Sequence, residues 1–204
     1  MDWSYLFLKR NRGWPSPEDS WGLTPMFGED GWCRSCGMPL REQCGPLKMR
    51  RAGLAKPEGA WTPNWRFDVL CVGEALASEL GRFAVDVRPV SWVGKSDPPA
   101  WQVVLPVVGS RWFDPARLSD LAVARHGVAG ETCPSCGTWR WMPVPTSELP
   151  PLEVRAALGG VDAASSPEWF GAGHQSYRKI LFRRELAELL AEVSPKDFKV
   201  LEAR

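Results

Sequence analysis

Two Cys-x-x-Cys-Gly units, "CRSCG" at 33–37 and "CPSCG" at 133–137, constrain the fold more than any other feature of the chain. In such a turn the two sulfurs converge on one point, and the glycine adopts a backbone conformation that a side chain would obstruct. One turn supplies half of a tetrahedral metal site, and two turns supply all of it. The sequence therefore predicts a fold that brings together segments one hundred positions apart.

We predict that these units form one closed, structural Zn²⁺ site, because four thiolates leave no open coordination position. The predicted ligands are Cys33, Cys36, Cys133 and Cys136. The units are much farther apart than the roughly 15–20 residues of a simple zinc ribbon, so the site is split between distant segments. The flanking apolar residues are expected to bury it against the core, namely Met38, Pro39, Trp139 and Trp141.

Two other interpretations of the cysteines stay open. A thioredoxin-like redox pair needs the motif at the start of a helix after a strand, whereas Pro143 and Pro145 follow the second unit. A decayed site would keep its cysteines only as small hydrophobic residues. Cys44 and His126 are candidates for a substitute ligand, although an ordinary thiol and a partner for a helix C-terminus are the simpler interpretations. Cys71 lies in an apolar run and is expected to be buried.

Composition limits the class of function. The chain of 204 residues carries 25 basic and 24 acidic residues, a net charge of +1. A general nucleic-acid binder needs a basic face, so nucleic acid is not an expected partner. The chain has no run of 18 apolar residues and no recognisable signal peptide, so we expect no membrane partner. A cytoplasmic, reducing compartment follows, in which cysteines are thiols or metal ligands rather than disulfides.

The chain is rich in tryptophan and poor in catalytic motifs. Its 12 Trp are expected to lie mostly in the core, and any that stay exposed would suit a protein–protein contact. We find no Gly-rich phosphate loop, no His-Glu-x-x-His and no nucleophile elbow. We therefore expect a binding protein and not an enzyme.

Hydrophobic periodicity predicts a single α+β domain over 1–204. The expected strands are 4–10, 67–72, 83–92, 101–109, 177–182 and 198–203. The expected helices are 73–80, 114–127 and 183–193, with a short one within 149–160. Pro106 indicates an edge or a bulge for strand 101–109, and the segments 11–32 and 142–176 are expected to be loop-rich.

The chain also shows a weak internal repeat between the halves 1–100 and 101–204. In each half the order is strand, Cys unit, Pro-x-Trp, strand, helix, strand. The aligned pairs are Phe67 with Tyr177, Leu76 with Leu186, and Leu80 with Leu190. We predict two pseudo-repeated strand–helix–strand units with a split, zinc-ribbon-like site at their junction. The alternative is that small α+β proteins repeat this pattern by chance.

Several segments together resemble the double-CXXCG paralogous family of myxobacteria. They are the two Cys units, "PNWRFDVL", "SPEWFG" and the ending "ILFRRELAELLAEVSPKDFKVLEA". The resemblance extends from the first Cys unit to the end of the chain and leaves out the N-terminal 30 residues and the Cys44 segment. Members of that family are described as immunity proteins of a contact-dependent swarm toxin system.

The resemblance implies a cytoplasmic immunity protein that binds a cognate protein toxin and neutralises it without catalysis. It implies no catalytic residues, and its paired motifs correspond to the four cysteines named above. Such a protein would occlude the toxin's active site with a rigid surface, with exposed Trp and Arg as anchors. The alternatives are a zinc-ribbon regulatory or nucleic-acid-binding module, and an enzyme of unrecognised type. The sequence does not predict the oligomeric state.

Overall fold

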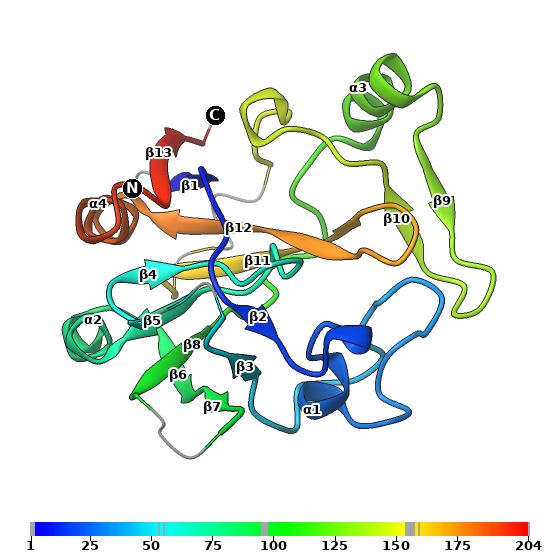
Figure 1. Ribbon diagram of the computed structural model, residues 1–204. Helices are drawn as coiled ribbons and strands as arrows, with labels where there is room; N and C mark the ends of the chain where they lie inside the picture. The colour runs from blue at the N-terminus through cyan, green and yellow to red at the C-terminus, as the bar shows by residue number, and fades with distance from the viewer. Residues whose placement is uncertain are drawn as a thin grey trace.

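The computed structural model describes residues 3–52, 54, 56–94, 98–153, 158 and 160–203. The described residues form a mixed fold of helices and β-sheets, which confirms the predicted α+β class (Figure 1). The strands are β1 (Trp3–Leu8), β2 (Trp14–Pro15), β3 (Lys48–Arg50), β4 (Ala60–Trp61), β5 (Cys71–Gly73), β6 (Asp86–Pro89), β7 (Ser91–Trp92), β8 (Ala100–Val104), β9 (Gly130–Thr132), β10 (Trp139–Trp141), β11 (Ala163–Phe170), β12 (Tyr177–Arg183) and β13 (Phe198–Glu202). The helices are α1 (Leu23–Phe27), α2 (Glu74–Glu79), α3 (Pro115–His126) and α4 (Arg184–Val193), with short 3₁₀ turns η1 (Glu18–Ser20), η2 (Leu80–Arg82) and η3 (Thr146–Glu148).

The largest sheet has the order β13-β1-β12-β11-β10-β9. Its neighbours are antiparallel except for β10 and β11, which are parallel. The first strand, β1, pairs with β13 over five residue pairs but with β12 over only two, Trp3 with Arg183 and Ser4 with Phe182. Beyond Ser4, β1 therefore follows β13 and separates from β12.

A four-stranded sheet has the order β4-β5-β8-β6, and a three-stranded sheet has the order β2-β3-β7. The expectation that Pro106 marks an edge strand or a bulge is wrong. The strand β8 ends at Val104, before the proline, and lies between β5 and β6. An interior strand needs all its N–H groups, so the proline falls outside it.

Helices α3 and α4 form where the sequence predicts them. The α3 helix begins after Asp114, whose side chain accepts a hydrogen bond of 2.8 Å from the N–H of Arg117, and Pro115 occupies its first turn. It ends at Gly127, which has the left-handed φ of 77° that glycine tolerates best. The α4 helix buries Leu186 and Leu190, as their spacing predicts.

The two helix-containing units show the same local arrangement. The α4 helix links β12 to β13, which flank β1, and the α2 helix links β5 to β6, which flank β8. The intervening strand is antiparallel to both neighbours in each case. Both helices bury leucines in one shared core, which contains Leu76, Leu80, Leu186 and Leu190. In Figure 1, α2 and α4 lie one below the other on the same side of the molecule. Superposition of the two units stays a prediction.

Sequence patterns missed several elements. The α1 helix, the β9–β10 hairpin and β11 lie in or beside segments expected to be loops. The β11 strand contains Pro167, and its pairing with β12 shifts register between Ser165 and Trp169. A strand with a proline and a bulge has no clean alternation, so periodicity could not reveal it. The short helix expected within 149–160 falls mainly on 154–157 and 159, which lie outside the described residues.

Candidate metal centre

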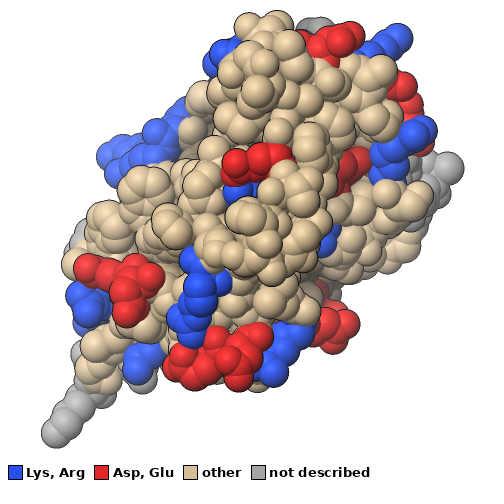
Figure 2. All heavy atoms as spheres, turned by 90° about the vertical axis from the view of Figure 1, so that its right-hand side faces the viewer, with Lys and Arg blue, Asp and Glu red and all other residues tan. Residues whose placement is uncertain are grey.

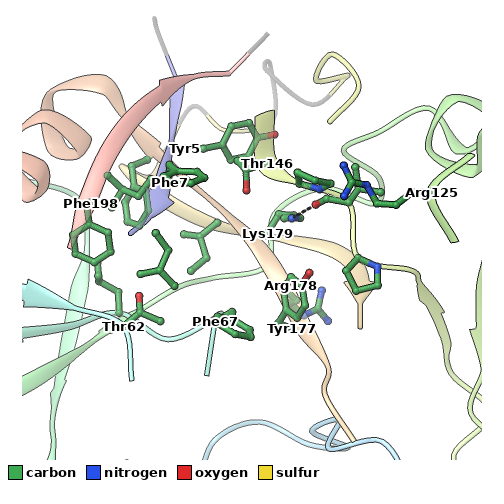
Figure 3. A pocket seen from close by; sticks show the side chains of 18 of the residues that line it. Tyr5, Phe7, Thr62, Phe67, Arg125, Thr146, Tyr177, Arg178, Lys179 and Phe198 are labelled. Carbon is green, nitrogen blue, oxygen red and sulfur yellow. Dashed lines mark hydrogen bonds between the residues drawn. The ribbon is translucent and has the colours of Figure 1, made fainter. Parts of the chain in front are cut away.

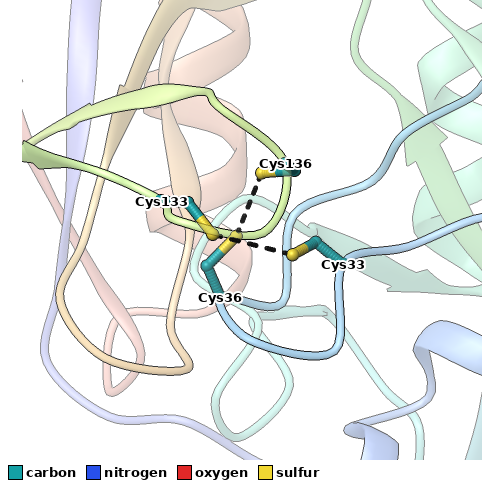
Figure 4. Close-up of side chains that lie close together, drawn as sticks. All are labelled: Cys33, Cys36, Cys133 and Cys136. Carbon is teal, nitrogen blue, oxygen red and sulfur yellow. Dashed lines mark hydrogen bonds between the residues drawn. The ribbon is translucent and has the colours of Figure 1, made fainter.

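The two Cys-x-x-Cys-Gly loops meet at one point (Figure 4). The Sγ atoms of Cys33 and Cys133 lie 3.7 Å apart, and so do those of Cys36 and Cys136. All four sulfurs lie within 4.8 Å of one another, and the cysteines form no disulfide. The structure thus brings together the four predicted ligands as one group that could hold a metal ion.

The spacing of the sulfurs fits a tetrahedral ion. A Zn²⁺ ion with bonds of about 2.3 Å to sulfur holds its four sulfurs about 3.8 Å apart. Two of the sulfur pairs have this separation, and no two sulfurs lie farther apart than 4.8 Å. Three of the four cysteines are buried and Cys136 is half-buried, so the thiols have few partners other than one another.

The two loops have the same backbone geometry. The N–H of Cys33 donates to the carbonyl of Met38 at 2.8 Å, and the N–H of Cys133 donates to that of Thr138 at 3.0 Å. The glycine that ends each motif donates back to the carbonyl of the first cysteine, at 2.8 Å for Gly37 and 2.9 Å for Gly137. These glycines have φ values of 70° and 73°, a region that glycine occupies readily.

Equivalent positions of the two loops face each other. Besides the two cysteine pairs, the hydroxyl groups of Ser35 and Ser135 lie 2.5 Å apart and share a hydrogen bond. Each contact joins a residue to the one at the same position of the other motif. Such self-matching contacts are typical of a two-fold axis, and here both sides belong to one chain.

Local dipoles and burial act differently on two of the thiols. The N–H of Cys136 donates toward the sulfur of Cys133, and this is the main reason that the pKa of Cys133 falls to about 6. Burial raises the pKa of Cys36 above its usual range. The thiol of Cys133 thus ionises readily, whereas the thiol of Cys36 needs a positive charge beside it in order to ionise. A bound divalent cation would supply that charge and keep all four sulfurs as thiolates.

A buried arginine connects the second loop to the first. Arg140, on β10, is 3% exposed and forms an ion pair with Glu131 on β9. Its guanidinium also donates to the carbonyl of Gly173 at 2.7 Å, and more weakly to that of Cys36 at 3.4 Å. The hydroxyl of Ser176 donates to the same Cys36 carbonyl at 2.7 Å. Arg140 therefore fixes the relative positions of both cysteine loops and of the segment 173–176.

The other sequence candidates do not join the cluster. Cys44 is exposed and lies 3.6 Å from the carbonyl of Met26. His126 ends α3, where its Nε2 lies 2.8 Å from the carbonyl of Pro143. Neither belongs to the group of possible ligands found among the described residues. Cys71 is fully buried in β5, as predicted for a small hydrophobic residue, and burial raises its pKa.

The expectation that apolar flanking residues bury the site holds for only part of them. Met38 is 2% exposed and packs with the cysteines, whereas Trp139 is 41% exposed. Trp139 lies on an edge hairpin and packs edge to face on Trp141, with ring centroids 5.5 Å apart. Trp169, from the neighbouring β11, packs against the cluster instead. Neither Arg140 nor Trp169 could be recognised from the spacing of the motifs.

Comparison of the chain with protein-family models, with curated proteins and with solved structures gives no match.

Proposed function

We propose that this chain is a non-catalytic, cytoplasmic immunity protein that binds a cognate protein toxin, with a structural zinc ion at the four-cysteine cluster. The proposal combines the family resemblance of the sequence with two features of the structure. These features are the closed geometry of the cluster and a rigid loop that presents an exposed tryptophan.

Zinc is the metal that we infer for the cluster. Four thiolates at tetrahedral spacing suit zinc or iron, and a site with four soft protein ligands does not activate water. The cysteines come from two loops that are one hundred positions apart, so metal bonds would hold distant segments together. This supports a role in stability rather than in catalysis.

The observation that carries the binding function is the loop that presents Trp65. Trp65 is 53% exposed and has a left-handed φ of 64°, which is unfavourable for a bulky residue. The loop around it is tightly held, because Asn64 donates to the carbonyl of Gly13 through both its backbone N–H, at 3.0 Å, and its side chain, at 2.8 Å. Arg66, which is 4% exposed, pairs with Asp68 at 3.1 Å.

A half-exposed aromatic residue held in a strained conformation costs the fold free energy, so we attribute its retention to binding. Tryptophan is among the residues most enriched at the energetic centres of protein interfaces. Trp14 is 37% exposed. It directly follows Gly13, whose carbonyl accepts the hydrogen bonds from Asn64 in the Trp65 loop. We therefore place the toxin contact at a surface that includes Trp65 and Trp14.

The net charge of +1 and the face that Figure 2 shows favour a protein partner over nucleic acid. On the face that Figure 2 shows, Lys and Arg alternate with Asp and Glu around a broad area of other residues. Nucleic-acid binding would require basic residues gathered along one face. In addition, no helix of the described ranges has both the length and the apolar character to span a bilayer.

We also propose that the two halves are a structural repeat whose pseudo-two-fold axis passes through the cluster. The matching strand orders β13-β1-β12-β11 and β6-β8-β5-β4 support this repeat. So does the pairing of Cys33 with Cys133 and of Ser35 with Ser135. Phe67 and Tyr177, which the sequence alignment pairs, also meet, with ring centroids 5.6 Å apart.

Co-expression with the product of a toxin gene encoded beside this chain tests the immunity function. We expect co-purification at equal stoichiometry and protection of the cells. Trp65→Ala should weaken binding by at least roughly tenfold, as expected for an interface hot spot. Trp139→Ala removes another exposed tryptophan, 41% exposed and in a different region, and serves as the matched control. Binding of DNA or RNA without binding of the toxin would refute the proposal.

A further inference from the structure

A cavity of about 470 Å³ opens where β1 and β12 separate. The two strands pair only at their ends near Ser4 and Phe182, and farther along β1 follows β13 instead. Side chains from both faces of the sheet therefore reach the gap. Its aromatic lining consists of Tyr5, Phe7, Phe67, Tyr177, Phe182 and Phe198 (Figure 3).

One amine lies in the wall of this cavity. Lys179, on β12, is only 8% exposed, and its Nζ donates to the carbonyl of Val144 at 2.8 Å. The same nitrogen lies 5.1 Å from the ring centroid of Phe170 and 5.4 Å from that of Tyr177. Burial lowers the pKa of Lys179 to about 8, so the amine is still mainly protonated at neutral pH. Among the described residues, the ammonium group of Lys179 thus contacts one carbonyl and two aromatic rings.

The charge of Lys179 has no counter-ion among the residues that the structure describes. None of the described residues that line the cavity is acidic. Arg125 lines the cavity as well, but it forms an ion pair with Glu148 at 2.7 Å. No ion pair of the described residues includes Lys179. A buried ammonium without a carboxylate is costly unless another group neutralises it.

A purely structural role for Lys179, which would only hold the Val144 segment, does not require an open apolar cavity beside the amine. Phe7 is 46% exposed at this cavity, and a large apolar side chain gains from being covered. Ligand sites are commonly apolar cavities of this size with few polar groups that fix the orientation of the ligand.

We propose that this cavity binds a small amphipathic carboxylate, with its alkyl or aromatic body against Phe7, Phe67 and Tyr177 and its carboxylate at Lys179. The ammonium would form a charge-assisted hydrogen bond to the carboxylate, which supplies the missing counter-ion. The apolar walls would exclude ligands that are polar throughout. The lining includes neither Trp65 nor any of the four cysteines of the metal centre, although Phe67 adjoins the loop that presents Trp65.

Calorimetric titration of the full-length protein at pH 7 with three octyl compounds tests the proposal. The probes are octanoate, octan-1-ol and octylamine, which share the alkyl chain and differ in head-group charge. We expect saturable binding of one octanoate per chain, octan-1-ol at least tenfold weaker, and no binding of octylamine. Absence of saturable octanoate binding, or equal affinity for octanoate and octan-1-ol, would overturn the proposal.

Three variants test where the ligand lies. Lys179→Met should abolish the preference for octanoate over octan-1-ol, whereas Lys48→Met, which removes an exposed lysine on β3, should keep it. Phe7→Asp changes an exposed position at the cavity and should weaken octanoate binding without unfolding the protein, which circular dichroism would verify. If Lys179→Met fails to fold, the Phe7→Asp result decides. Unchanged octanoate affinity in Phe7→Asp, or a folded Lys179→Met that keeps the preference, would contradict the assignment.

Discussion

The first cysteine loop is closed by an isolated bridge between Trp32 and Pro39, whereas the second loop is the tip of the β9–β10 hairpin. The hairpin pairs Trp139 with Thr132 and Trp141 with Gly130, and it is joined to the six-stranded sheet through β11. The internal hydrogen bonds of the two loops are the same, but their supports differ. The second loop is held by a sheet ladder, so we expect its shape to depend less on a bound metal ion. We expect the first loop to depend more on such an ion and on contacts from other segments.

The largest expected effect comes from removing a ligand. Cys33→Ser and Cys133→Ser should each lower the free energy of unfolding by on the order of 5 kcal/mol, because the binding energy of a structural metal is folding energy. Denaturant titration measures the loss, and elemental analysis should find about one zinc ion per chain in the parent protein.

Cys44→Ser is the matched control, since Cys44 is exposed and outside the cluster, and its stability should equal that of the parent. Parent protein that contains no metal and has normal stability would rule out the structural site. If Cys133→Ser stays folded, binds metal poorly and has lost only toxin binding, the metal site contributes to the toxin interface and not to stability.

Arg140→Met should be the next most damaging change. It leaves the buried carbonyl of Cys36 with one donor fewer and releases Glu131 from its ion pair. Loss of a buried charged hydrogen-bond network costs roughly 3 kcal/mol. Thermal unfolding measures this loss, with Arg34→Met, an exposed arginine of the first loop, as the control. A variant as stable as the parent would show that the two loops do not need this connection.

The two motif glycines should respond unequally to alanine. A Cβ at Gly37 would lie 2.5 Å from the backbone oxygen of His174, whereas a Cβ at Gly137 would have no neighbour within 4 Å. Both positions have positive φ, so each Gly→Ala change costs about 1 kcal/mol or more in backbone strain. Gly37→Ala should cost about 2 kcal/mol beyond that, since the clashing atom belongs to the backbone. If Gly37→Ala and Gly137→Ala lose equal stability, the two loops do not differ in how closely they are packed at this glycine.

Removal of the metal by chelation should give the smallest difference between the two loops. The difference should appear in the deuterium exchange rates of single amides. After treatment with a zinc chelator, the N–H groups of Cys33 and Gly37 should exchange with deuterium roughly tenfold faster relative to those of Cys133 and Gly137. The sheet ladder of β9 and β10 protects the second pair even without metal. Uniform loss of protection in both loops would mean that the hairpin is no better supported than the bridge.

The parts of the structure that the sequence predicts are those encoded by local rules. The cap at Asp114 and the stop at Gly127 predict α3, and the motif geometry predicts which cysteines meet. Arg140 could not be predicted, because its partners come from segments that adjoin it only in the fold. The same holds for Lys179, whose predicted strand is correct but whose burial depends on the separation of β1 from β12.

The position of β1 between β12 and β13 has a consequence for how the chain acquires its structure during synthesis. Ser4 in β1 pairs with Glu202 in β13 and with Phe182 in β12, so its partners leave the ribosome long after Ser4 itself. Until then, the apolar β1 has no strand beside it and can pair with other nascent chains. Contacts of such long sequence separation also slow folding. A cell that makes this protein must therefore protect an unpaired strand edge until the residues of β12 and β13 have been synthesised.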